Sequence, residues 1–231
     1  MSGLGDIVYA VSIWAVPVIV AITFHEAAHG YVAWRLGDDT AYRLGRVSFN
    51  PLKHIDLFGT IILPALLLLT VKFAFGWAKP VPVNFARLNR PRQDMVWVAA
   101  AGPATNIALA FASAVLIRIV GLFPAAVADW ATATLSASVL INLILAVFNM
   151  LPLPPLDGGR VAVGLLPDAL ARPLARLERW GLLIIIGMLF ILPFIGAQLG
   201  VNLSVFRWLV GGPVFFLVRL IETITGASLE F

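Results

Sequence analysis

Residues 7–34 read IVYAVSIWAVPVIVAITFHEAAHGYVAW, an apolar run that is long enough to cross a membrane as one helix. At 1.5 Å per residue the helix would be about 42 Å long, which exceeds the ~30 Å hydrocarbon core, so we expect it to tilt or to project beyond one face. Apart from two phenols, its ionisable side chains are His25, Glu26 and His29. Ionisable groups are costly inside a membrane helix, so these three mark a functional site.

The three side chains form the pattern His-Glu-x-x-His. Residues four apart on a helix stand one turn above each other, so both imidazoles share a face and can bind one zinc ion. Glu26 lies about 60° of helical rotation beyond His29 and can reach a water molecule on that metal. The alternative is that hydrogen bonds satisfy all three inside a helix bundle. Their place in a hydrophobic helix favours zinc.

Composition indicates an integral membrane protein. Of 231 residues, 61% are hydrophobic and 12% are charged, against about 25% charged in a soluble domain. The net charge of +4 is small and scattered, which excludes nucleic acid as a partner and fits basic loops beside the lipid bilayer. The chain has no cysteine, so any metal must be held by His, Asp or Glu.

We therefore expect an all-α integral membrane protein: a bundle of five to six transmembrane helices, with a re-entrant or broken segment and a short β-like loop near the active site. We expect one domain over residues 1–231, with a catalytic core over about 7–166 and scaffold helices over about 172–225. After the first helix, four further apolar runs predict full spans, at 95–122, 130–151, 180–198 and 205–221.

Residues 57–75 are apolar but are interrupted by Gly59 and Pro64, so they either cross the bilayer or dip in and return. If they return, every Lys and Arg except Arg118 and Arg207 lies on one side, whereas a crossing divides the charges more evenly. Positive charge concentrates in the cytoplasm. We therefore expect five full spans in the cell (inner) membrane, an N-terminus outside, a C-terminus inside and an active site towards the cytoplasmic side.

Two segments between the first spans allow extended structure. Residues 40–47 alternate in a way that permits a short strand. A second segment cannot be helical because closely spaced prolines fix its backbone; it comprises Lys79, Pro80, Val81, Pro82, Val83 and Asn84. It is a candidate edge strand that binds an unwound substrate by strand addition, with a plain proline-rich loop as the equal alternative.

A catalytic zinc site usually has three protein ligands and one water. Asp157 is the best candidate for the third ligand, because it is acidic, follows a proline-rich helix break and precedes two glycines. A helix N-cap is the alternative role for this aspartate. His54 is the rival ligand, although we expect it near the mouth of the site or in loop packing. Two further polar residues, Asn106 and Asn142, are expected to form hydrogen bonds between helices.

The motifs resemble those of the site-2 proteases, which are intramembrane zinc metalloproteases. Residues 25–29, HEAAH, match the first family motif, and residues 149–159, NMLPLPPLDGG, match the second. The small residues 101–103, AGP, resemble the helix between them, and the resemblance covers about residues 24–166. The chain leaves no room for an inserted PDZ or cystathionine-synthase-type (CBS) domain, so it resembles a compact prokaryotic subgroup.

The resemblance implies one zinc ion (Zn2+) per chain, bound by His25, His29 and Asp157, with Glu26 as the catalytic residue. It also implies that Asn149 lines the active site and helps to bind the substrate. The expected reaction is hydrolysis of peptide bonds in or near transmembrane segments of membrane-protein substrates, by zinc-activated water with Glu26 as general base. The sequence leaves open whether the chain forms an oligomer.

Two alternatives belong to other functional classes. One is a catalytically inactive relative that binds membrane proteins, against which the intact motif residues argue. The other is a metal transporter, which needs a chain of polar residues across the bilayer. The last two predicted spans lack such a chain.

Overall fold

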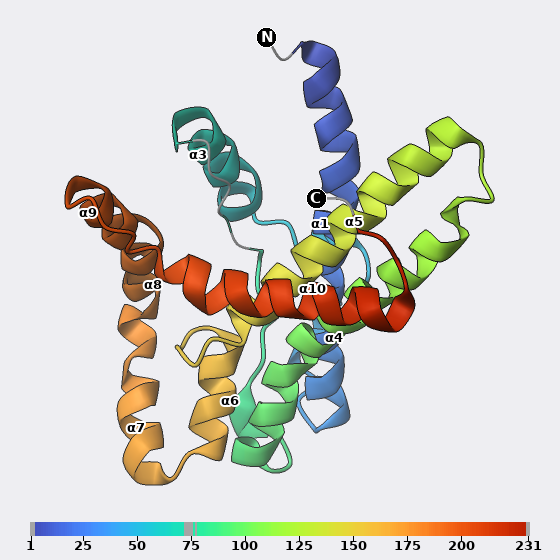
Figure 1. Ribbon diagram of the computed structural model, residues 1–231. Coiled ribbons are helices and arrows are strands. Elements are labelled where there is room, and N and C mark those ends of the chain that lie inside the picture. Colours follow the sequence, from blue (N-terminus) through green and yellow to red (C-terminus); the bar gives the residue numbers. More distant parts are fainter. Residues whose placement is uncertain (1–2, 72–75, 77, 230–231) are drawn as a thin grey trace.

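The computed structural model describes residues 3–71, 76 and 78–229 (Figure 1). The described part of the chain is helical and contains no β-strand. The N-terminal half contains α1 (Leu4–Arg35), α2 (Thr40–Arg43), η1 (Pro51–Lys53), η2 (Leu57–Ile62), α3 (Leu63–Val71), η3 (Phe85–Arg87) and α4 (Pro91–Val120). The C-terminal half contains α5 (Ala125–Asn149), α6 (Asp157–Leu165), α7 (Asp168–Arg176), α8 (Glu178–Ile186), η4 (Gly187–Ile191), α9 (Leu192–Gln198), η5 (Arg207–Gly211) and α10 (Gly212–Thr225).

Five helices among the described residues are long and apolar enough to cross a membrane, as the sequence predicts for an all-α membrane protein. They are Gly5–Arg35, Pro91–Val120, Ala125–Asn149, Glu178–Gln198 and Arg207–Thr225.

The centre of the molecule is formed by α1, α4 and α5. His25 contacts Asn106 on α4. The carbonyl of Leu36, directly after the end of α1, accepts a hydrogen bond from the amide of Asn89, directly before the start of α4. As the residue number increases along α1, the residue number of the contacting partner decreases, so α1 and α4 are antiparallel. Figure 1 shows α4 rising from the end at which α1 finishes. This orientation agrees with the expected five-span arrangement.

The interhelical hydrogen bonds expected for Asn106 and Asn142 are confirmed. The Asn106 amide donates to Asn142 at 2.8 Å, and both side chains are almost fully buried. Such contacts join helices where neither lipid nor water can satisfy a polar group.

The segment formed by η2 and α3 leaves the bundle and returns to its starting point. The amide of Lys79 donates to the carbonyl of His54 at 2.9 Å. The backbones of Gly76 and Gly59 also touch, because a Cβ on Gly76 would overlap the Gly59 carbonyl. Residues 72–75 and 77, on which part of the sequence prediction falls, lie outside the described residues. The meeting of the two ends matches the returning alternative for this segment.

Residues 40–47 do not form the short strand that their alternation permits, since α2 occupies Thr40–Arg43. The buried Asp38 side chain accepts a hydrogen bond from the backbone N–H of Thr40, which satisfies a donor at the start of α2 and favours a helical turn. Gly45 then ends that turn with φ near 62°, a conformation that suits glycine.

The end of α10 also differs from the expected topology, which placed Arg118 and the C-terminus on opposite faces. Arg118, near the end of α4, donates to the carbonyl of Thr225, the last residue of α10, at 2.8 Å. Figure 1 shows α10 crossing α4 and α5. Charge counting could not reveal this, because it assumes that each apolar run passes straight through the bilayer.

Candidate functional site

Three potential metal ligands from distant parts of the chain meet in the bundle. His25 and His29 lie one turn apart on α1, and Asp157 is the first residue of α6. The two Nε2 atoms are 3.0 Å apart, and they lie 3.2 and 3.4 Å from Asp157 Oδ2. The structure thus brings together the three residues that the sequence nominated as zinc ligands.

The hydrogen bonds of the other ring nitrogens determine the histidine tautomers. His29 Nδ1 lies 2.7 Å from the carbonyl of Val98, which can only accept, so this nitrogen carries the proton. His25 Nδ1 lies 2.6 Å from Asn106 Oδ1 and donates to it, while the Asn106 amide donates to Asn142. Both Nε2 atoms therefore point their lone pairs towards the aspartate.

This donor set fits a zinc ion. Two imidazole lone pairs and the carboxylate oxygen Oδ2 of Asp157 face one another, and no residue in the described part of the chain donates a hydrogen bond to this buried oxygen. Three electron-rich atoms at such distances repel each other unless a cation lies between them. Two nitrogen ligands and one oxygen ligand leave a fourth tetrahedral position open, as in catalytic zinc sites.

Asp157 is positioned by the shape of the chain around it. The N-cap of α6 is Leu156, so the alternative role of Asp157 as the N-cap is wrong. A Cβ at Gly158 or Gly159 would overlap the backbone of the preceding loop. The two glycines therefore let that loop fold back against α6 and direct its first residue towards α1.

Gly102 on α4 closes the site from another side. A Cβ there would lie 2.5 Å from His29 Nε2 and 2.6 Å from His25 Nε2. The sequence analysis noted this residue only within the small-residue run 101–103 of the family resemblance, whereas the structure places its bare Cα against the metal-facing atoms. The Ala-Gly-Pro run was the available signal, but it did not reveal which helix face was affected.

Glu26 lies between the metal ligands and an extended segment that we call the strap, residues 79–84. Its Oε2 accepts a hydrogen bond from the backbone N–H of Val81 at 2.7 Å. A Cβ on Gly30 would lie only 3.0 Å from the Val81 side chain, so this glycine lets the strap lie close against α1. The strap is extended but does not form a β-strand.

Hydrogen bonds hold the strap at both ends and between them. Lys79 binds the His54 carbonyl at one end, and the amide of Asn84 donates to Asp38 at 2.6 Å at the other. Arg46 Nη2 lies 2.8 Å from the carbonyl oxygen of Lys79 and 3.3 Å from that of Pro80. The sequence analysis missed Arg46 and Asp38, because nothing local relates them to a segment more than thirty residues away.

Asp38 is ionised in the folded protein. Burial alone would raise the pKa of its carboxyl group, but hydrogen bonds from Thr40 and Asn84 and the charge of Arg87 outweigh burial and lower the pKa. The strap is therefore held at this end by a charged acceptor.

A cavity of about 530 Å³ opens beside the ligands and Glu26. Four of the expected substrate-binding residues line it, namely Pro80, Val81, Val83 and Asn149, whereas Lys79, Pro82 and Asn84 do not. Its other walls include Phe85, Phe148, Pro155, Leu156, Arg160, Leu182 and Ile185. The largely apolar lining and the few polar groups are typical of a ligand site.

His54 lies outside the group of three ligands. It is 1% exposed, and its Nε2 donates to the carbonyl of Ser48 at 2.8 Å. This contact places it in loop packing, and the rival assignment of His54 as third ligand does not match the geometry.

Comparisons with known proteins agree with this chemistry. The family model of peptidase family M50 matches residues 116–193. The Bacillus subtilis protein named "Putative zinc metalloprotease YwhC" is 38% identical over 182 residues, which are 77% of this chain and 80% of that protein. The Mycolicibacterium smegmatis protein named "Putative zinc metalloprotease Rip2" is 29% identical over 193 residues, covering 82% of this chain and 69% of that protein. No solved structure matches the chain.

Proposed function

The chain belongs to peptidase family M50, the site-2 protease family of zinc metallopeptidases, and from that premise we propose that it cuts membrane-protein substrates in or near their transmembrane segments. The observation that carries the proposal is the meeting of His25, His29 and Asp157 beside Glu26, inside a bundle of membrane-length helices. A scissile bond would reach them through the adjoining cavity.

Each site residue has a separate role. His25 and His29 would bind the metal through Nε2, and Asp157 through Oδ2. When bound, zinc supplies a Lewis acid and makes water a competent nucleophile near neutral pH. Glu26 takes the proton from the attacking water and passes it to the leaving amine.

The strap and Asn149 would hold the substrate. A helical peptide bond is shielded by its own hydrogen bonds, so the substrate must be unwound locally. Pro80 and Pro82 have no N–H, and the amide of Val81 is bound to Glu26. The backbone N–H and carbonyl of Val83 have no hydrogen bond within the described part of the chain, so they are suited to strand addition by a substrate.

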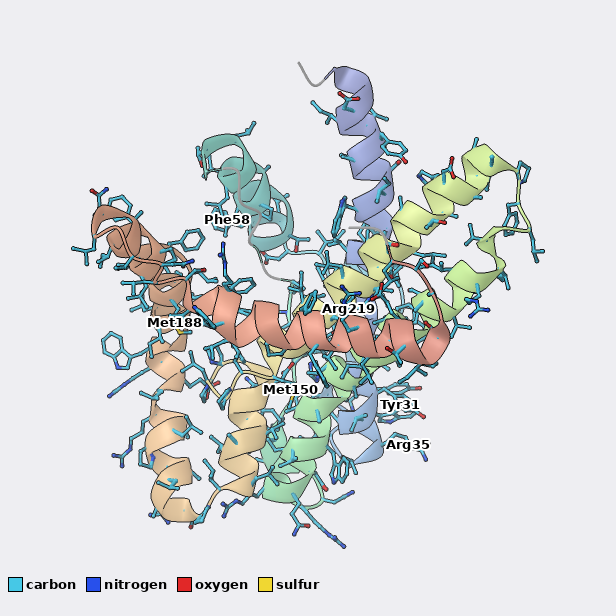
Figure 2. All side chains as sticks on the ribbon, in the orientation of Figure 1. Tyr31, Arg35, Phe58, Met150, Met188 and Arg219 are labelled. Carbon is cyan, nitrogen blue, oxygen red and sulfur yellow. The ribbon has the colours of Figure 1, made fainter. Side chains whose placement is uncertain are left out.

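We also place the N-terminus outside the cell membrane and the zinc site towards the cytoplasm. The end of α1, the start of α4 and the α6–α7 turn lie together in Figure 1, and Figure 2 shows Arg35 at this end. Arg92 is bonded to Asp168 there, which joins the basic regions of α4 and α7. Basic segments of this kind remain in the cytoplasm.

Cysteines placed at Leu52 and Asn89 should both resist an impermeant thiol reagent in intact cells. Labelling at Asn89 alone would contradict this topology.

The substrate proposal can be tested by sequencing new N-termini in membranes that contain equal amounts of the wild-type protein or Glu26→Gln. New termini inside or beside transmembrane segments, present only with the wild type, would support it. Identical termini in both samples would favour the alternative, an inactive relative that binds membrane proteins.

A further inference from the structure

We propose that Arg46 is a positioning residue for Glu26: by holding strap carbonyls, it fixes the Val81 N–H on the Glu26 carboxylate. The inference rests on the proposed function, because it assigns Arg46 a part in the reaction although Arg46 reaches neither the metal ligands nor the cavity. It concerns two side chains, Arg46 and Glu26, that are far apart in the sequence and contact opposite ends of one peptide group.

That peptide group is the bond between Pro80 and Val81. Its carbonyl oxygen lies 3.3 Å from Arg46 Nη2, and its N–H donates to Glu26 Oε2 at 2.7 Å. Because a peptide group is planar and rigid, fixing its oxygen also fixes the direction of its N–H. A cation at the oxygen and an anion at the hydrogen also polarise the group in the same sense, which strengthens both contacts.

Glu26 needs such an anchor. A glutamate side chain has several rotatable bonds, and holding it in one conformation costs conformational entropy. The bond from Val81 holds one carboxylate oxygen, so the other oxygen is left for a water molecule between Glu26 and the metal ligands. A charge-assisted hydrogen bond of this type is about twice as strong as a neutral one.

Both the backbone and the side chain of Arg46 are fixed by hydrogen bonds. Its backbone N–H donates to the carbonyl of Ala41 at 2.9 Å, which closes the turn after α2. Its Nη2 contacts the carbonyls of Lys79 and Pro80, while its buried Nε has no hydrogen-bond partner among the residues that the structure describes. Burying a guanidinium nitrogen without a partner is unfavourable, so the contacts of the other nitrogen offset a real cost.

The other anchors of the strap bind its ends. His54 binds the amide of Lys79, and Asp38 binds that of Asn84, but neither touches the peptide group between Pro80 and Val81. Loss of Arg46 should therefore free the middle of the strap while its ends and the metal ligands stay in place.

The test uses the full-length, zinc-loaded protein in detergent, with fluorescein-labelled casein as the substrate. Arg46→Ala should retain wild-type zinc content, lose about ten- to a hundredfold in kcat and change KM by less than about threefold, since a general base contributes on the order of 10²–10⁴. Arg46→Lys should recover part of kcat, because an ammonium group can still bind one carbonyl. Arg43→Ala is the matched control: Arg43 pairs with Asp39 and does not touch the strap.

Hydrogen exchange at the Val81 amide provides a readout that does not depend on activity. Exchange should be faster by roughly tenfold or more in Arg46→Ala and in Glu26→Gln, and unchanged in Arg43→Ala. Loss of zinc from Arg46→Ala would show a structural role and overturn the proposal. A rise in kcat would do the same, because the strap would then be inhibitory.

If the zinc-loaded wild type does not cleave casein, the result contradicts the proposed function and does not test the role of Arg46. Hydrogen exchange at the Val81 amide then tests that role by itself. Unchanged exchange at Val81 in Arg46→Ala would then refute it.

Discussion

Replacing Gly102 with alanine should remove zinc from the site while leaving the helices in place. The added methyl carbon would lie 2.5 Å from His29 Nε2 and 2.6 Å from His25 Nε2, whereas an ordinary contact needs about 3.4 Å. One or both rings, or α4 itself, must move by roughly 0.9 Å. Zinc–ligand distances tolerate only about 0.2 Å.

The expected loss of zinc affinity is at least about a hundredfold, equivalent to about 2.7 kcal/mol. This is the upper end of the usual effect of a residue that merely supports a ligand. Affinity can be measured by competition with a fluorescent zinc chelator. Gly121→Ala is the matched control, because a Cβ at the end of the same helix meets nothing within 4 Å. If Gly102→Ala binds zinc within about threefold of the wild type, the metal does not lie between these two rings.

Three further predictions follow from the site and the strap. Asn106→Leu removes the acceptor of the His25 N–H, so zinc affinity should fall by about 10- to 100-fold in the same competition assay, and an unchanged affinity would show that this contact does not orient the ring. Asp157→Ala should leave less than about a tenth of the zinc measured by elemental analysis, whereas His54→Ala should retain it; the reverse result would mean that the third ligand is misassigned. The lowered pKa of Asp38 stabilises the folded protein above its ordinary value of 3.8, and this stabilisation is lost as the pH falls through the folded-state pKa. The melting temperature of Asp38→Asn should therefore lie several degrees below that of the wild type at pH 6 and approach it as the pH falls below 3.8, and a gap that does not narrow would refute the assignment.

The sequence predicted the features that depend on local spacing or on long apolar runs. The helix that carries His25 and His29 followed from hydropathy and an i,i+4 pair, and five membrane-length helices matched the expected spans. Asp157 could be nominated because a proline-rich break is a local signal. In the structure, the side chains of His25, His29 and Asp157 lie together, as the sequence analysis proposed.

Features that depend on contacts between distant segments were missed or misjudged. Asn106 was assigned to helix packing, and its role beneath His25 depends on a partner 81 positions away. Arg46 could not be given a role from the sequence, because its contacts with the strap arise only once the η2–α3 segment has returned. The alternation at residues 40–47 permits a strand, but it does not reveal the hydrogen bond from Thr40 to Asp38 that favours a helical turn there.

The most direct test of the account compares the purified wild-type protein with Glu26→Gln on a synthetic peptide that contains one glycine-weakened transmembrane helix. Zinc content and cleavage are measured on the same samples. We expect equal zinc in both proteins, cleavage within the helix by the wild type, and cleavage at least about a hundredfold slower with Glu26→Gln, as loss of a general base requires. Cleavage by Glu26→Gln at a rate near that of the wild type, with zinc retained, would contradict the assignment of Glu26 as the base.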